Sequence, residues 1–340
     1  MQQMIWAVLI SFLAVMVMAP IGIPLLKKLK YGQTIYELGP QSHLAKQGVP
    51  TMGGVMIAIA VTIVGLVLTW GDSRWDFALY VMLSGLLHGA IGFADDYIKV
   101  AKKRSLGLTP WQKIALQIIS GLALTLWAYF NPCVGSAVVV PYWNVEWNLG
   151  LFYVPLIILM YVFMINSSNL LDGLDGLLAS CSVVGLSAFA LACLAMALGA
   201  SRIPAPAGVD AAYYAENLRN AALVCAAGAG ACLGFLRFNT NPARVIMGDT
   251  GSMFIGGLFV GVAVVTRLEF LLIPICFAMI ISSLSVMIQV AYCNMSGGRR
   301  LFKMSPLHHH FELCGMSEPR IVAMYTLMSV VTCLLALLAL

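Results

Sequence analysis

The fold is decided by the stretch at residues 77–100, which reads FALYVMLSGLLHGAIGFADDYIKV. Its apolar part, residues 77–94, contains no Asp, Glu, Lys or Arg, and two adjacent acids, Asp95 and Asp96, follow it directly. A helix that crosses a bilayer needs about 20 mostly apolar residues, and its backbone polar groups are satisfied within the segment. The stretch therefore predicts a membrane-spanning helix with a pair of carboxylates at its end.

The rest of the chain has the same apolar character. Of its 340 residues, 61% are hydrophobic and 10% are charged, and the mean hydropathy is +0.92. Soluble domains carry about 25% charged residues. Because the apolar runs are continuous rather than alternating, we expect an all-α integral membrane protein with about ten transmembrane helices. The expected spans are 4–26, 51–70, 77–94, 111–130, 150–166, 176–199, 218–236, 251–266, 270–292 and 321–340.

The first run, residues 4–26, is read as a span because it lacks a basic leader and is too long for the core of a signal peptide. No soluble stretch interrupts the series, so residues 1–340 are expected to form a single polytopic membrane domain. The nine cysteines show no CxxC spacing and lie mostly inside apolar runs, which favours small core residues over a metal site.

Basic residues are distributed unequally between the two sets of loops. Loops that follow odd-numbered spans, with the span ends, carry 15 Lys and Arg residues, whereas the remaining loops carry four. Positively charged loops stay in the cytoplasm. The bias predicts that both termini are periplasmic, and it explains the net charge of +5 without nucleic-acid binding.

Four polar motifs interrupt the apolar pattern, and all of them follow odd-numbered spans. They are ADDY at 94–97, NSSNLLDGLDG at 166–176, MGDTGS at 247–252 and SPLHHHFE at 305–312. They are therefore expected to meet on the cytoplasmic face, although they are scattered through the chain. Convergence on one face is what a single composite active site requires.

Asp95 and Asp96 lie next to the hydrocarbon boundary, where unpaired carboxylates are costly and usually functional. Adjacent carboxylates repel each other, so a bound cation would stabilise them, or one of them could act as a base. The alternative is a solvated helix end that faces Lys99 and Lys102.

Asn166, Asn169, Asp172 and Asp175 recur every three residues, so neighbours in the series lie about 60° apart on a helix. Oxygen ligands of this kind suit Mg²⁺ together with phosphate oxygens. A glycine such as Gly173 lets a substrate approach the backbone closely. The alternative is a polar turn with Asp175 as the N-cap of the next span.

Asp249 stands between glycines at the expected start of a helix, with the hydroxyls of Thr250 and Ser252 beside it. Helix N-termini bind phosphate, and a metal-binding aspartate there would bring a cation to the same place. Simple capping of the helix is the alternative.

His308, His309 and His310 are consecutive and therefore point in different directions, which disfavours one tetrahedral zinc site. One imidazole could reach a phosphate or a proton, while a structural tract is the alternative. Basic residues on the same face, including Lys46 and Lys113, could hold a diphosphate or an anionic lipid head group. Together these features indicate metal-dependent phosphoryl transfer at a membrane surface.

The four motifs, with PTMGG at 50–54, together resemble the polyprenyl-phosphate N-acetylhexosamine-1-phosphate transferase superfamily, and within it the bacterial phospho-N-acetylmuramoyl-pentapeptide transferase family. The resemblance covers nearly the whole chain. It implies ten spans in the bacterial inner membrane, a cytoplasmic active site and a homodimer. It also implies the reaction, in which UDP-N-acetylmuramoyl-pentapeptide and undecaprenyl phosphate give lipid I and UMP with Mg²⁺ as cofactor.

The resemblance further implies roles for individual side chains. It gives catalytic roles to Asp95, Asp96, Asp249 and His308, and it gives Mg²⁺ binding to Asp249 with help from Asp172. It gives substrate binding to a second group: Lys46, Lys99, Lys113, Asn169, Asp172, Asp175, His309 and His310.

Two positions depart from the family pattern. Ile246 stands where members usually have a phenylalanine that stacks on uracil, and Val49 replaces a threonine before the PTMGG stretch. An aliphatic side chain cannot supply ring stacking. The geometry of base recognition therefore stays open.

Three alternatives also stay open at the level of sequence. The lipid phosphate could attack the donor directly, or a phospho-aspartyl intermediate could form on Asp249 or Asp95. The donor could carry N-acetylglucosamine instead, although the intact HHHFE run at 308–312 favours the muramoyl-pentapeptide branch. A cation-coupled transporter would need ionisable groups at mid-depth, and His88 is the one plausible residue there.

Overall fold

The computed structural model of the chain describes residues 1–28, 48–72, 74–101, 107–143, 145–203 and 205–340. Lys46 and Lys102, which the sequence analysis singled out, lie outside the described residues. The long helices are α1 (Gln2–Lys28), α2 (Gly54–Thr69), α3 (Asp76–Ala101), α4 (Pro110–Phe130), α5 (Tyr153–Leu171), α6 (Leu177–Ala197), α7 (Ala211–Asn239), α8 (Gly248–Thr266), α10 (Phe277–Met295) and α12 (Glu318–Leu337). The short elements are β1 (Ala137–Val140), β2 (Val145–Asn148), η2 (Gly150–Phe152), η3 (Glu269–Leu271), α9 (Leu272–Ile275) and α11 (Leu307–Leu313).

The ten long helices coincide with the ten expected spans, and the chain is an all-α integral membrane protein. Within the described residues, nine of them are long and apolar enough to cross a membrane. The tenth, α2, has 16 residues, and at about 1.5 Å per residue it falls short of the roughly 30 Å hydrocarbon core.

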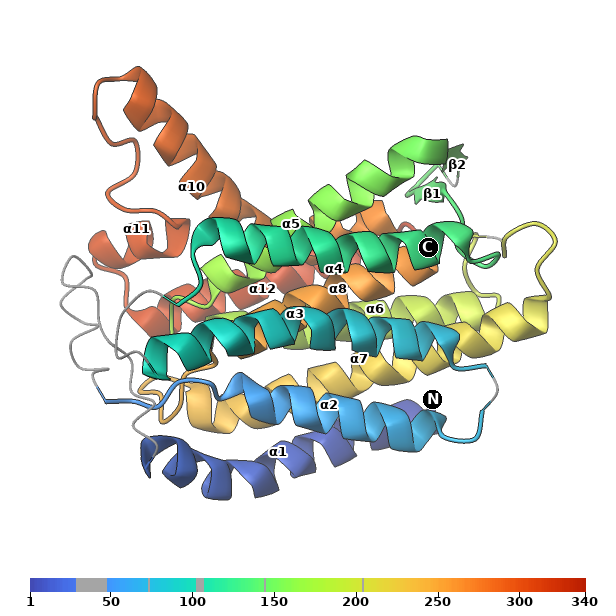
Figure 1. Ribbon diagram of the computed structural model, residues 1–340, viewed down its shortest axis with the longest axis horizontal. Coiled ribbons are helices and arrows are strands. Elements are labelled where there is room, and N and C mark those ends of the chain that lie inside the picture. Colours follow the sequence, from blue (N-terminus) through green and yellow to red (C-terminus); the bar gives the residue numbers. More distant parts are fainter. Residues whose placement is uncertain (29–47, 73, 102–106, 144, 204) are drawn as a thin grey trace.

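Successive long helices run in opposite directions along the bundle (Figure 1). Both chain termini lie at its right-hand end in that view, whereas α3, α5 and α7 end, and α8 and α12 begin, at its left-hand end. The polar motifs are attached to these left-hand helix ends. The structure therefore brings them to one end of the bundle, opposite the termini, as the loop parity predicts.

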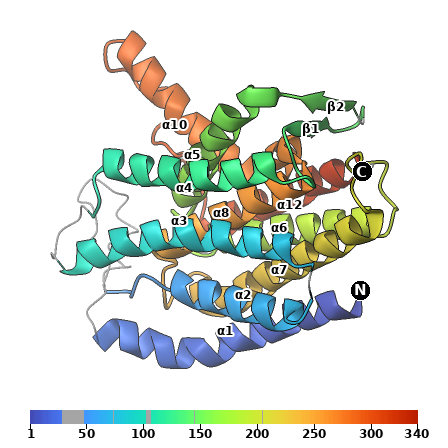
Figure 2. The same cartoon turned by 45° about the vertical axis from the view of Figure 1, so that its right-hand side comes forward.

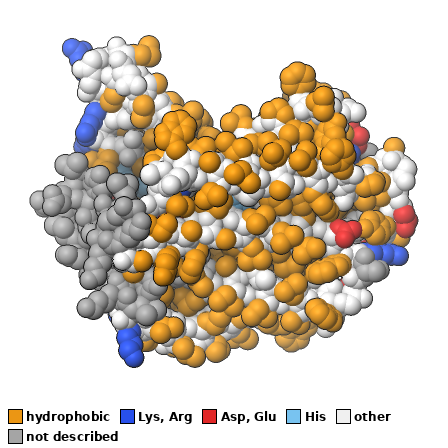
Figure 3. Space-filling view, viewed as in Figure 1, with side chains coloured by type: hydrophobic (Ala, Val, Ile, Leu, Met, Phe, Trp, Pro, Cys, Tyr) orange, Lys and Arg blue, Asp and Glu red, His pale blue; other side chains and the backbone are white. Residues whose placement is uncertain are grey.

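The surface matches a protein embedded in lipid. Figure 3 shows hydrophobic side chains spread over the visible face of the bundle, with charged side chains gathered towards its two ends. Helix α10 leans away from the other helices in both ribbon views (Figures 1 and 2), and its outward side chains such as Met287 and Val290 are exposed. Seven of the nine cysteines are buried, which confirms that most of them are core residues.

The central helix is α8, in which 89% of the apolar stretch is buried inside the protein. Small residues allow this burial, because a Cβ atom at Gly257 would lie 2.4 Å from the carbonyl oxygen of Ser84 on α3. On another face, a Cβ at Gly256 would lie 2.9 Å from the Cα of Ile165 on α5. Glycines thus let α8 approach α3 and α5 closely, as is usual between membrane helices.

The gap between the fourth and fifth expected spans, residues 131–149, contains an antiparallel hairpin of β1 and β2 that the apolar pattern did not predict. The hairpin lies at the same end of the bundle as the chain termini (Figure 2). The N–H of Val139 donates to the carbonyl of Arg267, at 3.0 Å, so the hairpin is joined to the end of α8. Its strands have four residues each, too short for a clear alternating pattern.

Candidate active site

Three carboxylates meet where α3 ends and α8 begins. One oxygen from each of Asp95, Asp96 and Asp249 lies within 4.8 Å of the others. The approach depends on Gly92, where a Cβ atom would lie 2.2 Å from the carbonyl oxygen of Asp249. The tight crossing of the two helices therefore brings together acids that are more than 150 positions apart in the sequence.

Two lysines neutralise most of this charge. The Lys99 Nζ lies 2.6 Å from Asp95 Oδ2 and 3.0 Å from Asp249 Oδ2. The Lys113 Nζ, from the first turn of α4, lies 3.1 Å and 2.7 Å from the same two oxygens. The sequence-predicted residues Lys99 and Lys113 thus join Asp95 and Asp249 in one ion-pair network.

The other oxygen of Asp249 is held from α5. Asn169 Nδ2 donates to Asp249 Oδ1 at 2.8 Å and to Ser252 Oγ at 2.9 Å. Asn166, one step earlier in the series, instead donates to Gln117 Oε1 on α4 at 2.8 Å. Two members of the series spaced every three residues therefore have different partners. Asn169 holds Asp249 of the acid cluster, whereas Asn166 connects α5 to α4.

Asp96 has different partners from Asp95. Its Oδ2 accepts hydrogen bonds from the Thr250 N–H at 2.9 Å and from Thr250 Oγ1 at 2.8 Å, and its Oδ1 accepts from the Asp249 N–H at 3.3 Å. Lys99 Nζ stands 3.9 Å from it. Asp96 therefore lies in the cluster, but both of its oxygens accept hydrogen bonds from the first residues of α8.

Asp172 follows α5 as its C-cap residue and joins the same region. Its carboxylate accepts a hydrogen bond from the backbone N–H of Gly248. Burial raises the pKa of Asp172 well above its usual range, and the nearby charges of Asp249 and Asp96 raise it further. A cation at this position would favour the ionised form of Asp172 and relieve the repulsion between these acids.

Asp175 contacts a different segment. Its Oδ2 accepts from Asn241 Nδ2 and from the Ala243 N–H, both at 3.1 Å. The N-cap of α6 is Gly176, with φ +80° and no side-chain cap, so the alternative that Asp175 caps this helix is wrong. Its role in substrate binding, which the family resemblance implies, stays a prediction.

The three histidines lie on the short helix α11, where the sequence analysis expected a loop. His308 is fully buried, and a Cβ atom at Gly173 would lie 2.5 Å from its Nε2. The absence of a side chain at Gly173 therefore makes room for His308, and not for a substrate as expected from the sequence. His309 Nδ1 lies 3.1 Å from Glu312 Oε2, and His310 Nδ1 accepts from the Lys303 N–H at 3.1 Å. The Nε2 of His309 would lie 3.1 Å from the same Cβ atom at Gly173, and the rings of His308 and His309 are 4.4 Å apart. The expectation that the three rings point in different directions is therefore wrong for His308 and His309, which meet at Gly173.

A cavity of about 360 Å³ opens onto the ion-pair network. It is lined by Asp95, Lys99, Gly107, Leu108, Pro110, Lys113, Ile114 and Asn166. The chain just before α4 also contributes to the site and was not among the predicted residues: the Leu108 N–H donates to Asp95 Oδ1 at 2.8 Å. Gly107 is the sequence feature that could have indicated this contact, because a Cβ atom there would lie 2.5 Å from Asp95 Oδ1 and only glycine leaves room for the carboxylate.

The PTMGG stretch packs on the start of α8. The N–H of Gly53 donates to the Ile246 carbonyl at 2.9 Å, and a Cβ at Gly54 would lie 2.1 Å from the Cα of Gly251. Ile246 is held by its backbone, since its N–H also donates to the Pro50 carbonyl at 2.8 Å. The glycines of this motif thus serve close packing around the cluster.

The cluster has the donor set for a divalent cation. Carboxylate oxygens are the ligands that Mg²⁺ prefers, usually with phosphate oxygens and water. Three carboxylates face two ammonium groups, so the network keeps one negative charge when all five groups are ionised. Asp95, Asp96 and Asp249 lie close enough together to hold such an ion, and Asp172 stands near Asp249 and Asp96.

Comparison with known proteins gives one consistent result. Residues 78–267, from α3 to the end of α8, match glycosyl transferase family 4. The phospho-N-acetylmuramoyl-pentapeptide-transferase of Clostridioides difficile (strain 630) is 40% identical over 99% of this chain and 98% of its own length. The protein of the same name from Desulfitobacterium hafniense is 39% identical over 99% of this chain and 98% of its own length. That from Clostridium botulinum (strain Alaska E43 / Type E3) is 38% identical over 98% of this chain and 95% of its own length.

These relatives match the chain from end to end, and the matched family segment contains both helices that supply the acid cluster. The sequence motifs indicated the same family before any comparison. The chain is a member of the phospho-N-acetylmuramoyl-pentapeptide transferase family, and it is a multi-pass membrane phospho-glycosyl transferase.

Proposed function

We propose that this chain transfers phospho-N-acetylmuramoyl-pentapeptide from its UDP donor to undecaprenyl phosphate, giving lipid I and UMP in bacterial peptidoglycan synthesis. The observation that carries the proposal is the network of Asp95, Asp249, Lys99 and Lys113 at one end of a membrane helix bundle. Both substrates are phosphate esters, and one of them is a lipid. A charged cluster beside a cavity at the bundle end suits both.

In this proposal the two lysines hold the phosphates. Lys99 and Lys113 are 33% and 21% exposed, and both line the cavity. Their ammonium groups would turn from the carboxylates towards the donor diphosphate and the lipid phosphate when these enter. Cationic side chains of this kind neutralise the charge of a transferring phosphoryl group.

Asp249 and Asp172 are proposed as the Mg²⁺ ligands, with Asp95 beside them. When bound, Mg²⁺ would neutralise charge on the diphosphate and stabilise the leaving UMP. Asp95 lines the cavity and would orient the attacking lipid phosphate or accept its proton. The fully buried His308 lies against the Asp172–Gly173 turn, where its proposed role is to stabilise that turn and a phosphate next to it.

We favour direct attack by the lipid phosphate over a covalent intermediate on Asp249. Both oxygens of Asp249 are engaged, Oδ2 by two lysines and Oδ1 by Asn169. When the lysines turn to the phosphates, Oδ2 would hold Mg²⁺ while Oδ1 would stay with Asn169. Asp249 would then have no free oxygen directed at the phosphorus atom, as a nucleophile needs.

The decisive experiment is a transfer assay on purified protein with radiolabelled UDP-N-acetylmuramoyl-pentapeptide and undecaprenyl phosphate. Label should move to the lipid only with Mg²⁺, chelation should abolish transfer, and UDP-N-acetylglucosamine should be a poor donor. Transfer that persists in excess chelator would refute the metal. Exchange of labelled UMP into the donor without lipid would refute direct attack.

We further propose that the active site faces the bacterial cytoplasm and that the protein acts as a homodimer. Cys314 is exposed and lies at the active-site end, one residue after α11. A membrane-impermeant maleimide should therefore label it in inverted vesicles but not in right-side-out vesicles. Labelling in right-side-out vesicles would reverse the orientation, and light scattering of the detergent-solubilised protein would test the dimer.

A further inference from the structure

We infer that Asp96 and Thr250 act together as a cap on α8 that positions Asp249, so that neither contacts the substrate or the metal. Asp96 comes from α3 and lies about 150 residues before α8 in the sequence, so it caps this helix from a neighbouring helix and not from the adjoining chain. The inference rests on the proposed function only in taking Asp249 as the residue that works on the diphosphate.

The start of α8 needs such a partner. The first N–H groups of a helix have no acceptor within the helix. Met247, the N-cap residue of α8, has helical backbone angles and supplies no side-chain hydrogen bond. Asp96 accepts from two of these N–H groups, those of Asp249 and Thr250. Its negative charge also lies at the positive end of the helix dipole.

The geometry leaves little room for another role. Asp96 is 3% exposed, and a Cβ atom at Gly248 would lie 2.9 Å from its Oδ2. Gly248 has φ +78°, so the chain turns into α8 directly against this carboxylate. Both oxygens of Asp96 are already hydrogen-bonded to α8.

The neighbouring acid shows the contrast. Asp95 Oδ2 lies within 3.1 Å of both lysines, and Asp95 lines the cavity. Asp96 does not line this cavity and stands 3.9 Å from the nearer lysine. The two adjacent carboxylates therefore have different roles. Asp95 faces the cavity, and Asp96 holds the start of the helix that carries Asp249.

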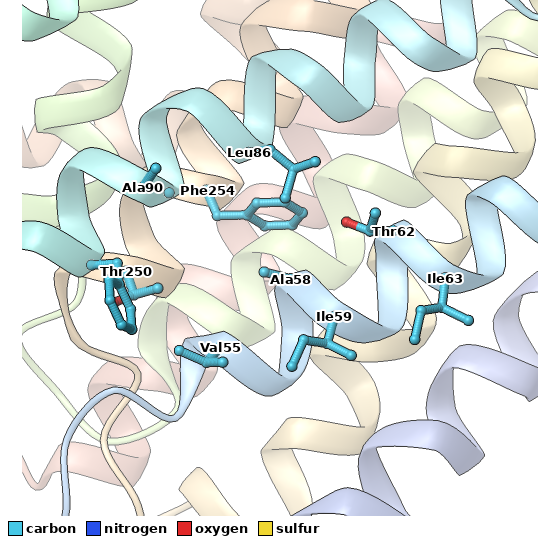
Figure 4. Close-up of a pocket in the computed structure, with 11 residues that line it drawn as sticks. Val55, Ala58, Ile59, Thr62, Ile63, Leu86, Ala90, Thr250 and Phe254 are labelled. Carbon is cyan, nitrogen blue, oxygen red and sulfur yellow. The ribbon is translucent and has the colours of Figure 1, made fainter.

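Thr250 completes the cap with its hydroxyl, which gives Asp96 Oδ2 a second donor. Its side chain lines a separate, apolar groove of about 400 Å³ between α2 and α3, floored by Phe254 (Figure 4). Thr62 lines the same groove, but among the described residues its buried hydroxyl has no hydrogen-bond partner. The two threonines share an apolar environment and differ in whether the hydroxyl holds Asp96.

This difference provides a matched experiment. We would compare Thr250→Val, Thr250→Ser and Thr62→Val in the full-length protein. Each variant would be measured for kcat, for KM of the nucleotide donor, for Mn²⁺ affinity by electron paramagnetic resonance and for thermal unfolding in detergent.

We expect Thr250→Val to lower kcat about tenfold, with donor KM unchanged, because a hydrogen bond to a charged group is lost. Thr250→Ser keeps the hydroxyl and should restore the wild-type kcat. Thr62→Val makes the same change of side chain and should leave kcat unaltered. In an Asp96→Ala background, Thr250→Val should add less than about twofold, since the two residues act as one unit.

Mn²⁺ binding separates the cap from a metal ligand. Asp96→Asn should keep Mn²⁺ affinity within about tenfold of wild type, whereas Asp249→Asn should abolish it. The inference would be overturned by wild-type kcat in Thr250→Val, or by an Asp96→Asn protein that loses Mn²⁺ as completely as Asp249→Asn. If the wild-type protein bound no Mn²⁺, the proposed metal would fail, and the kcat series would still decide the cap.

Discussion

The two ends of α8 both carry buried charges, and they use them in opposite ways. At its beginning, Asp249 lies in a network of acids and lysines that opens onto a cavity. At its end, the C-cap residue Arg267 is 2% exposed and pairs with Glu146 of the hairpin at 3.0 Å. Glu269 lies next to it and accepts a hydrogen bond from Tyr153 at 3.3 Å.

The helix dipole favours both arrangements, with an acid at the N-terminus and a base at the C-terminus. What distinguishes the ends is the environment. The Arg267 end is enclosed and joins the hairpin to the bundle, whereas the Asp249 end has excess acid and partly exposed lysines. Buried charge by itself therefore does not mark an active site, and our proposal rests on the unbalanced charge beside a cavity.

The largest expected effect separates the two ends directly. Asp249→Asn should lower transfer about 10²- to 10³-fold, because the charge that holds the cation is lost while the side chain keeps its shape. Glu269→Gln, the matching change at the other end, should leave kcat within about threefold of wild type. Steady-state transfer assays check both, with thermal unfolding as the control for folding. Equal losses in the two variants would remove the distinction.

The second effect concerns the lysines of the network. Lys113→Met should lower kcat roughly 10- to 100-fold, since a charge-assisted contact to phosphate is lost. Lys303→Met removes the same charge at the same end of the bundle, but Lys303 Nζ donates to the Leu313 carbonyl. This control should retain most of its activity in the same assay. A similar loss in both variants would point to general surface charge instead of the network.

The third effect concerns stability at the hairpin end. Arg267→Met should destabilise the protein by about 2–3 kcal/mol, towards the low end for a broken buried pair because Glu146 is 39% exposed. Arg219, which is 46% exposed and pairs with Glu216, provides the control, and Arg219→Met should cost less than about 0.5 kcal/mol. Unfolding in mixed micelles measures both. Unchanged stability in Arg267→Met would mean that the pair does not hold the hairpin.

The smallest effect is a pH dependence. Burial raises the pKa of Glu269 to about 8, from 4.5, despite the nearby Arg267. Between these two values the unfolded chain releases this proton and the folded chain keeps it, so the contribution of Glu269 to stability falls as pH rises from about 4.5 to about 8. Glu269→Gln should therefore flatten the decline of unfolding temperature over this range. Parallel curves for wild type and variant would contradict the buried, protonated carboxyl.

Much of the fold could be predicted from the sequence. Continuous apolar runs give the ten helices, because lipid leaves the backbone no alternative to helical hydrogen bonding. Loop parity places the four polar motifs at one end of the bundle, and the structure confirms this. The hairpin at 137–148 could not be predicted, since its short strands are stabilised by contacts with Arg267. The helix at the histidines was missed for a similar reason, because α11 has only seven residues.

Residue types and spacing in the sequence determined that this protein spans a membrane and that acids and lysines gather at one end. The family resemblance added the prediction that Asp95, Asp249, Lys99 and Lys113 belong to one site. Only the tertiary structure decided how adjacent residues differ. Asp95 and Asp96 are equivalent in the sequence, but the crossing of α3 and α8 turns the first towards the lysines and the second towards the helix start. Side-chain direction depends on which helix packs on which face, and local sequence does not specify it.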